Sequence, residues 1–148
     1  MLNPNTILVV EDNELLSSII ADLLQGEGYQ VCMARNGLEG YLSYKSHRSD
    51  TVVTDIEMPE LDGFEMMRCI RTVNPSVNTI YMSGATAQYR RALAAEAQKF
   101  GAFFLRKPFA GKDLLKLISL SSKAMGLTRL SKYERSFYQK RLLFKEAV

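Results

Sequence analysis

Short apolar runs alternate along the chain with longer segments in which apolar residues recur every three or four positions. A short continuous run is typical of a buried strand, and the wider spacing is typical of an amphipathic helix. Strands are predicted at residues 6–10, 29–34, 51–54, 78–82 and 102–106, and helices at 14–25, 38–46, 64–71, 87–100 and 112–125. The strict alternation predicts an α/β domain built on a doubly wound parallel sheet with five strands and five helices.

The first predicted helix shows its apolar stripe most clearly. The stripe consists of Leu15, Leu16, Ile19, Ile20, Leu23 and Leu24. This spacing places the six side chains along one side of a helix, as in a helix that packs on a core. Gly26 and Gly28 suit its C-terminal end.

The composition supports one folded domain with room for a short appendage. Of the 148 residues, 47% are hydrophobic and 24% are charged, which is typical of a soluble globular protein. Residues 1–122 hold 12 Lys and Arg against 14 Asp and Glu, a net charge of −2, whereas residues 123–148 hold 7 against 2, a net charge of +5. We therefore predict a domain over 1–122 and a basic C-terminal extension, either a helix or a linker, over 123–148.

No segment predicts a membrane span or export. The apolar runs, such as residues 7–10, are too short to cross a bilayer. Residues 1–5 lack the basic and apolar parts of a signal peptide. Cys32 and Cys69 are too few for a disulfide framework or a cysteine-based zinc site. We expect a cytoplasmic protein.

The polar residues that directly follow the predicted strands are expected to form a site, because ligands of open α/β sheets bind beyond the carboxyl ends of the strands. These residues are Glu11, Asp12, Asp55, Ser83 and Lys107. Three carboxylates held together repel one another, so one of them is protonated or the group holds a cation. Oxygen ligands without a nearby His or Cys favour Mg²⁺. A magnesium site facing one ammonium group suits phosphoryl transfer to a carboxylate nucleophile.

Four motifs stand in order at these strand ends. They are Val9-Val10-Glu11-Asp12-Asn13, Asp55-Ile56-Glu57-Met58-Pro59-Glu60-Leu61-Asp62-Gly63, Met82-Ser83-Gly84 and Lys107-Pro108-Phe109. Together they resemble the response-regulator receiver family of two-component signal transduction, over about residues 1–122. The resemblance implies the flavodoxin-like fold of the chemotaxis regulators, with strand order 2-1-3-4-5.

The resemblance implies a phosphoacceptor and a metal site. Asp55 would accept a phosphoryl group from a sensor histidine kinase or a phosphotransfer protein in a Mg²⁺-dependent reaction. Glu11 and Asp12 would hold Mg²⁺ together with Asp55, directly or through water, and the main-chain carbonyl of Glu57 would complete the protein ligands. Glu57 also places a further carboxylate beside the acceptor.

The resemblance also implies a group that binds the phosphoryl oxygens and switches the surface. Ser83, which stands where many members have Thr, would hydrogen-bond the phosphoryl group, and Lys107 would pair with it. Phe104 matches the aromatic switch position, three residues before Lys107. The bond before Pro108 is usually cis in this family. The stretch from Ser83 to Lys107 is slightly longer than usual, so the fourth helix or its loops are expected to differ.

Some of these residues have simpler interpretations. Ser83 alone is a typical turn residue, and a plain core aromatic on the fifth strand is the alternative interpretation of Phe104. His47, the single histidine, lies in a polar loop and is expected to be solvated.

Competing functions fit the residues less well. An aspartate-nucleophile phosphatase usually has a second Asp two residues after the nucleophile, where this chain has Glu57, and it encloses its substrate with a cap insertion. A nucleotide or flavin binder needs a Gly-rich loop after the first strand, where this chain has Glu11-Asp12. We interpret the chain as a phosphoacceptor signalling domain with only self-phosphorylation and self-dephosphorylation chemistry. A fragment of a larger DNA-binding or hybrid-kinase protein stays an alternative.

The extension carries its own apolar stripe. It consists of Leu127, Leu130, Tyr133, Phe137 and Phe144. The stripe predicts a helix that packs on its own domain, on a second copy or on a partner, with a linker to a missing output domain as the alternative. Among the structured options we favour a homodimer. Neither membrane nor nucleic-acid binding is expected for this chain.

Overall fold

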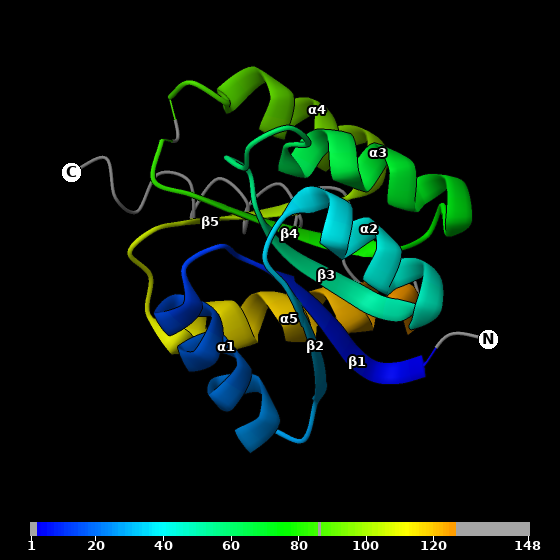
Figure 1. Cartoon of the computed structure of the whole chain (residues 1–148), viewed down its shortest axis with the longest axis vertical. Coiled ribbons are helices and arrows are strands. Elements are labelled where there is room, and N and C mark those ends of the chain that lie inside the picture. The colour runs from blue at the N-terminus through cyan, green and yellow to red at the C-terminus, as the bar shows by residue number, and fades with distance from the viewer. Residues whose placement is uncertain (1–2, 86, 127–148) are drawn as a thin grey trace.

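The computed structural model describes residues 3–85 and 87–126, and within them five strands alternate with five helices (Figure 1). The strands are β1 (Asn3–Val10), β2 (Gln30–Ala34), β3 (Ser49–Asp55), β4 (Asn78–Ser83) and β5 (Phe103–Arg106). The helices are α1 (Glu14–Gly26), α2 (Gly37–Ser46), α3 (Gly63–Val73), α4 (Arg90–Phe100) and α5 (Gly111–Gly126). All strand pairs are parallel and their order is β2-β1-β3-β4-β5, so the predicted fold is confirmed.

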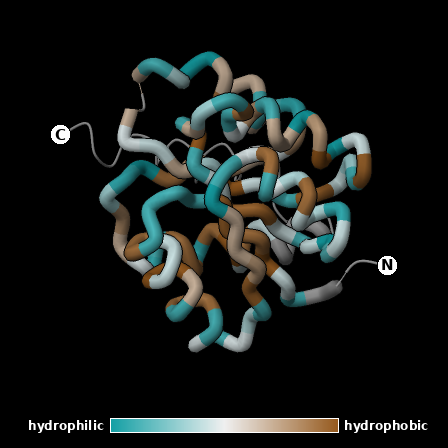
Figure 2. The backbone as a smooth tube through the Cα atoms, viewed as in Figure 1, coloured by the Kyte–Doolittle hydropathy of each residue, from teal (hydrophilic) through white to brown (hydrophobic). Residues whose placement is uncertain are grey.

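Helices cover both faces of the sheet. In Figure 1, α2, α3 and α4 lie on one face and α1 and α5 on the other, and each face has its own apolar cluster. The last four residues of β1, Ile7 to Val10, are at most 1% exposed, because a central parallel strand is covered on both sides. The apolar segments in Figure 2 accordingly gather in the middle of the molecule, along the strands.

Most element boundaries differ from the prediction by one or two residues, and β1 and α4 each begin three residues away from it. β1 begins at Asn3 and β3 at Ser49, and these two residues pair with each other before the register shifts. Asn and Pro are poor strand formers, so only this pairing reveals the extension. α4 begins at Arg90 and not at residue 87, because residues 87–89 form a turn and Tyr89 provides no side-chain cap.

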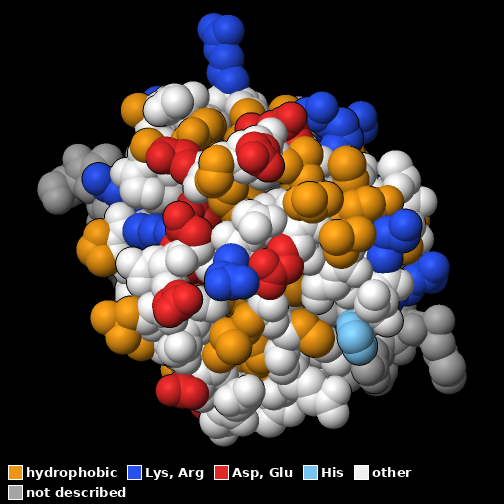
Figure 3. Space-filling model, viewed as in Figure 1, with side chains coloured by type: hydrophobic (Ala, Val, Ile, Leu, Met, Phe, Trp, Pro, Cys, Tyr) orange, Lys and Arg blue, Asp and Glu red, His pale blue; other side chains and the backbone are white. Residues whose placement is uncertain are grey.

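The apolar stripe of α1 is wider than its buried face. Ile20 and Leu24 are buried, whereas Leu15 is 72% and Ile19 is 55% exposed. Other large exposed apolar side chains lie on β2 and α2, namely Met33, Leu38 and Leu42. Figure 3 shows apolar side chains interspersed with acidic and basic ones on the viewed face. The period of the stripe therefore predicted the helix correctly but overstated how much of it is buried.

The C-terminal end of α5 passes through the predicted domain boundary at residue 122 and continues to Gly126. Residues 127–148, with their apolar stripe, lie outside the described residues, so the helical extension and the homodimer stay predictions. No helix in the described part of the chain is both long and apolar enough to cross a membrane.

Candidate functional site

Asp55 is the last residue of β3, a central strand flanked by β1 and β4. Its side chain is 11% exposed. The loop that follows is held tightly: the Ile56 N–H donates to the Met82 carbonyl at 3.0 Å, and the Gly63 N–H donates to the Ile56 carbonyl at 2.9 Å. A Cβ on Gly63 would lie 2.4 Å from the Asp55 carbonyl oxygen, so only glycine allows this approach.

The start of α3 is fixed by a capping box. The Asp62 carboxylate accepts from the Glu65 N–H at 2.8 Å, and the Glu65 carboxylate accepts from the Asp62 N–H at 3.2 Å. Such a reciprocal cap satisfies two main-chain donors at the beginning of a helix. The capping box thereby fixes the end of the loop that follows Asp55 and carries Glu57. The side chain of Glu57 is exposed.

Glu11 and Asp12 follow β1 directly, beside the end of β3. The Glu11 N–H donates to the Ala34 carbonyl of β2 at 3.0 Å, and its side chain is buried at 2% exposure. The side chain of Asp12 is exposed. Asn13 then caps α1 by accepting from the Leu16 N–H at 3.0 Å, which fixes the position of the acidic pair.

The structure brings the three predicted carboxylates together. One oxygen each from Glu11, Asp12 and Asp55 lies within 4.8 Å of the others. All three donors are hard oxygen ligands, and the described residues add neither a His nor a Cys to the group. This donor set fits a magnesium ion and does not fit zinc or copper.

Lys107 provides the opposing charge. Its ammonium Nζ lies 2.7 Å from Glu11 Oε2 and 3.4 Å from Asp55 Oδ2. The Lys107 N–H donates to the Ser83 carbonyl at 2.9 Å, which ties β5 to the end of β4, and the peptide bond from Lys107 to Pro108 is cis. In this arrangement the lysine is closer to Glu11 than to the candidate acceptor.

Burial dominates the electrostatics of the site. Burial raises the pKa of Asp55, Asp12 raises it further, and Lys107 opposes the rise. Burial likewise raises the pKa of Glu11 against the hydrogen bond from Lys107. For Lys107, burial lowers the pKa but Glu11 and Asp55 together outweigh that effect, so its pKa is raised. The site therefore keeps its lysine charged and favours an additional positive charge.

Ser83 and Phe104 both lie inside the protein. Ser83 is 1% exposed and its hydroxyl oxygen accepts from the Ala85 N–H at 3.0 Å, a turn contact that fits its simpler interpretation. Phe104 is 5% exposed and belongs to the apolar cluster on the α2–α3–α4 face. The ring is thus already packed inward, and its role as a switch stays a prediction.

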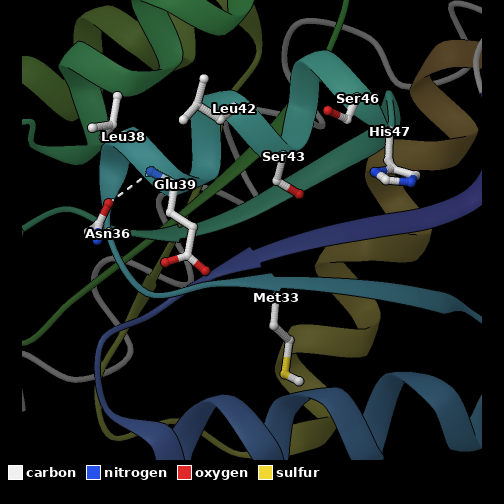
Figure 4. A pocket seen from close by; sticks show the side chains of 8 residues that line it. All are labelled: Met33, Asn36, Leu38, Glu39, Leu42, Ser43, Ser46 and His47. Atoms are coloured by element: carbon white, nitrogen blue, oxygen red, sulfur yellow. Dashed lines mark hydrogen bonds between the residues drawn. The ribbon is translucent and has the colours of Figure 1, made fainter.

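A separate open pocket of about 510 Å³ lies at the outer edge of β2, beside α2 (Figure 4). The apolar part of the pocket is lined by Met33, Leu38 and Leu42. Asn36 and His47 lie at its opposite ends. None of the residues that line it belongs to the carboxylate cluster. His47 is exposed, as the sequence predicted.

Sequence reasoning did not identify two features that position the site. The contact of Gly63 with the Asp55 carbonyl lies within a quoted motif, but only the fold shows it. A buried polar cluster of Arg71, Tyr81 and Glu96 gave no local signal, because its members lie 10 to 25 residues apart on three elements.

Comparison with known proteins places the same motifs in one family. The family model of the response regulator receiver domain matches residues 7–119. The chain is 40% identical to the transcriptional regulatory protein ZraR of Klebsiella oxytoca, over 84% of this chain and 27% of that protein. It is 32% identical to the chemotaxis protein CheY of Thermotoga maritima, over 79% of this chain and 97% of that protein.

One of the solved structures that the chain resembles contains a magnesium ion. The receiver domain of sensor histidine kinase PA1611 from Pseudomonas aeruginosa PAO1, with a magnesium ion coordinated in its active-site cleft, matches with a TM-score of 0.69 and 27% identity. The match covers 84% of this chain and 100% of that one. The chain thus spans about a quarter of ZraR but almost all of CheY and of the PA1611 domain.

Proposed function

This chain belongs to the response regulator receiver domain family, and we propose that it acts in the cytoplasm and accepts a phosphoryl group on Asp55 from a sensor histidine kinase or phosphotransfer protein. The observation that carries the proposal is the meeting of Glu11, Asp12, Asp55 and Lys107 at the carboxyl edge of the sheet. The family is a signalling family, so the expected output is a changed partner-binding surface and not a released product.

Asp55 is the proposed nucleophile. One of its carboxylate oxygens forms a bond to phosphorus while the bond from phosphorus to the donor's histidine nitrogen breaks, and the product is an acyl phosphate. Self-dephosphorylation later transfers the same group to water. Because Asp55 ends a strand that is held on both sides, its carboxylate is already oriented when the donor arrives.

Opposing charges would stabilise the transferred group. Mg²⁺ bound by the carboxylates of Glu11, Asp12 and Asp55 and the carbonyl of Glu57 would neutralise charge on the phosphoryl oxygens. The magnesium ion in the related PA1611 domain supports this assignment. Lys107, already 3.4 Å from Asp55, would pair with another phosphoryl oxygen.

In this proposal, two residues connect phosphorylation of Asp55 to a change of the partner-binding surface, namely Ser83 and Phe104. The Ser83 hydroxyl would donate to the phosphoryl group while its oxygen lone pairs stay available to the Ala85 N–H. Phe104 would respond through the core that it shares with β4. A few charge-assisted hydrogen bonds are enough to shift two arrangements that differ by a few kcal/mol.

The test is the intact mass of the protein after incubation with acetyl phosphate. The wild-type chain should gain one phosphoryl mass only when Mg²⁺ is present, and Asp55→Asn should gain none. Asp12→Ala should require much more Mg²⁺. Asp22→Asn, which alters an exposed carboxylate on α1, is the matched control and should behave as the wild type. Phosphorylation of Asp55→Asn at the wild-type rate would refute the assignment.

A further inference from the structure

Helix α4 has little apolar attachment to the rest of the fold. Leu93 is its only buried residue, and no side chain caps its first turn. Helices in globular proteins are held mainly by an apolar face packed on the core. The arrangement of α4 must therefore depend heavily on whatever other contacts it makes.

These other contacts include a polar group that is largely removed from water. Arg71 on α3 donates through Nη1 to both carboxylate oxygens of Glu96 on α4, at 2.9 and 3.2 Å. The Tyr81 hydroxyl on β4 donates to the same carboxylate. The two charged side chains are only 9% and 16% exposed, and the Arg71 guanidinium lies 3.6 Å from the centre of the Phe100 ring. One carboxylate of α4 is thus held by both neighbouring elements.

The tyrosine keeps its proton in this environment. Burial raises the pKa of Tyr81, and the hydrogen bond to Glu96 raises it further. The hydroxyl is therefore a permanent donor to Glu96. Hydrogen bonds of this kind, to a charged acceptor away from water, are stronger than neutral ones.

The same tyrosine stands next to the candidate switch residues. Tyr81 precedes Ser83 by two residues on β4 and pairs in register with Phe104 on β5. Its ring centre lies 4.8 Å from that of Phe64, which in turn lies 5.9 Å from that of Tyr89 before α4. Tyr81 therefore connects the strand pair that carries the candidate switch residues to the side chains that hold α4.

We propose that Arg71, Tyr81 and Glu96 form a latch that holds α4 in the arrangement described here and opposes the change that phosphorylation of Asp55 brings about. The regulatory part of this inference rests on the proposed function. In this proposal the latch stabilises the unphosphorylated arrangement more than the phosphorylated one, so weakening it makes the phosphorylated arrangement easier to reach. By linkage, a ligand that favours the phosphorylated arrangement then binds more tightly by the same factor.

Tyr81→Phe tests the latch with the least disturbance, because it removes one hydroxyl and keeps the ring. Losing a hydrogen bond to a charged group predicts that amide-exchange protection of residues 90–100 falls by about tenfold without any phosphodonor. Beryllofluoride, a phosphoryl mimic, should bind the variant with Mg²⁺ up to about tenfold more tightly. Glu96→Gln, which removes the charge that holds Arg71, should shift both quantities in the same direction.

Tyr44→Phe is the matched control. Its hydroxyl is also hydrogen-bonded inside the protein, to the Ser49 carbonyl at 3.0 Å and to Asn74 at 2.8 Å, and neither of these partners lies on α4. This control should lower overall stability and leave both α4 protection and beryllofluoride affinity unchanged.

Two results would overturn the latch. One is amide exchange of α4 in Tyr81→Phe that is the same as in the wild type or as in Tyr44→Phe. The other is faster amide exchange of α4 in Tyr81→Phe without any change in its affinity for beryllofluoride. A wild-type protein that accepts no phosphoryl group would instead count against the proposed function, and the exchange of α4 would still decide whether the three residues hold it.

Discussion

Replacing Asp55 with asparagine should stabilise the protein in the absence of metal. The wild-type side chain is only 11% exposed, and its carboxylate lies in a group with those of Glu11 and Asp12. Asparagine has nearly the same shape, so the substitution removes the charge and leaves the packing in place. The change in the free energy of unfolding therefore reports how unfavourable the charged carboxylate is in this site.

The magnitude follows from the distances. Two like charges 4.8 Å apart repel by about 3–4 kcal/mol at an effective dielectric constant near 20, and Asp55 faces two of them. The attraction between the Lys107 ammonium group and the Asp55 carboxylate, 3.4 Å apart, offsets about 5 kcal/mol of this repulsion at the same dielectric constant. Asp12 is exposed, so solvent weakens the repulsion between its carboxylate and that of Asp55. Asp55→Asn should therefore raise the free energy of unfolding by about 1–2 kcal/mol.

The sign of the pH dependence follows from the raised pKa of Asp55. Above that pKa the folded protein carries an unfavourable carboxylate, and below the ordinary value of 3.8 the group is protonated in both folded and unfolded chains. The advantage of the variant should therefore be largest near neutral pH and should shrink as the pH falls towards 3.8. Added Mg²⁺ should stabilise the wild type more than the variant.

Urea unfolding in EDTA at several pH values measures these differences. Asp22→Asn is the control, because it neutralises an exposed carboxylate and should change stability by less than about 0.5 kcal/mol. The electrostatic account fails if Asp55→Asn is no more stable than the wild type near neutral pH, or if its advantage persists unchanged in acid.

Two further substitutions examine the support around Asp55. Lys107→Met removes the ammonium group proposed to pair with a phosphoryl oxygen, so phosphorylation by acetyl phosphate should slow by about 10²-fold, and an unchanged initial rate would contradict the role of the lysine. Gly63→Ala forces a Cβ against the Asp55 carbonyl and should cost about 1–3 kcal/mol in denaturant unfolding. Gly26→Ala, where nothing lies within 4 Å, should be close to neutral, and equal effects of the two alanines would show that the close approach is not limiting.

The site was predictable because it depends on where strands end. Glu11, Asp55 and Lys107 each follow a buried apolar run, and the carboxyl ends of parallel strands meet at one edge of the sheet. The type and order of the elements followed from the same periodicity. Local signals alone were enough to assemble the carboxylate cluster.

Features that depend on contacts between distant elements were not predictable. The extension of β1 to Asn3 is held by pairing with Ser49, and the strand propensity of the residues in this segment does not predict it. The exposure of Leu15 and Ile19 depends on how far the sheet and α5 cover α1. Tyr81 gave no polar signal in its apolar run, because its partner Glu96 becomes a neighbour only when α4 packs beside β4.

The most direct measurement of the central claim is chemical trapping of the phosphorylated residue. An acyl phosphate on an aspartate is reduced by borohydride to homoserine, so the modified position can be identified by peptide mass. After incubation with acetyl phosphate and Mg²⁺, we predict homoserine at position 55 and unmodified aspartate at positions 12, 50 and 62. Homoserine at another position, or none in a protein whose intact mass has increased by one phosphoryl group, would contradict the account.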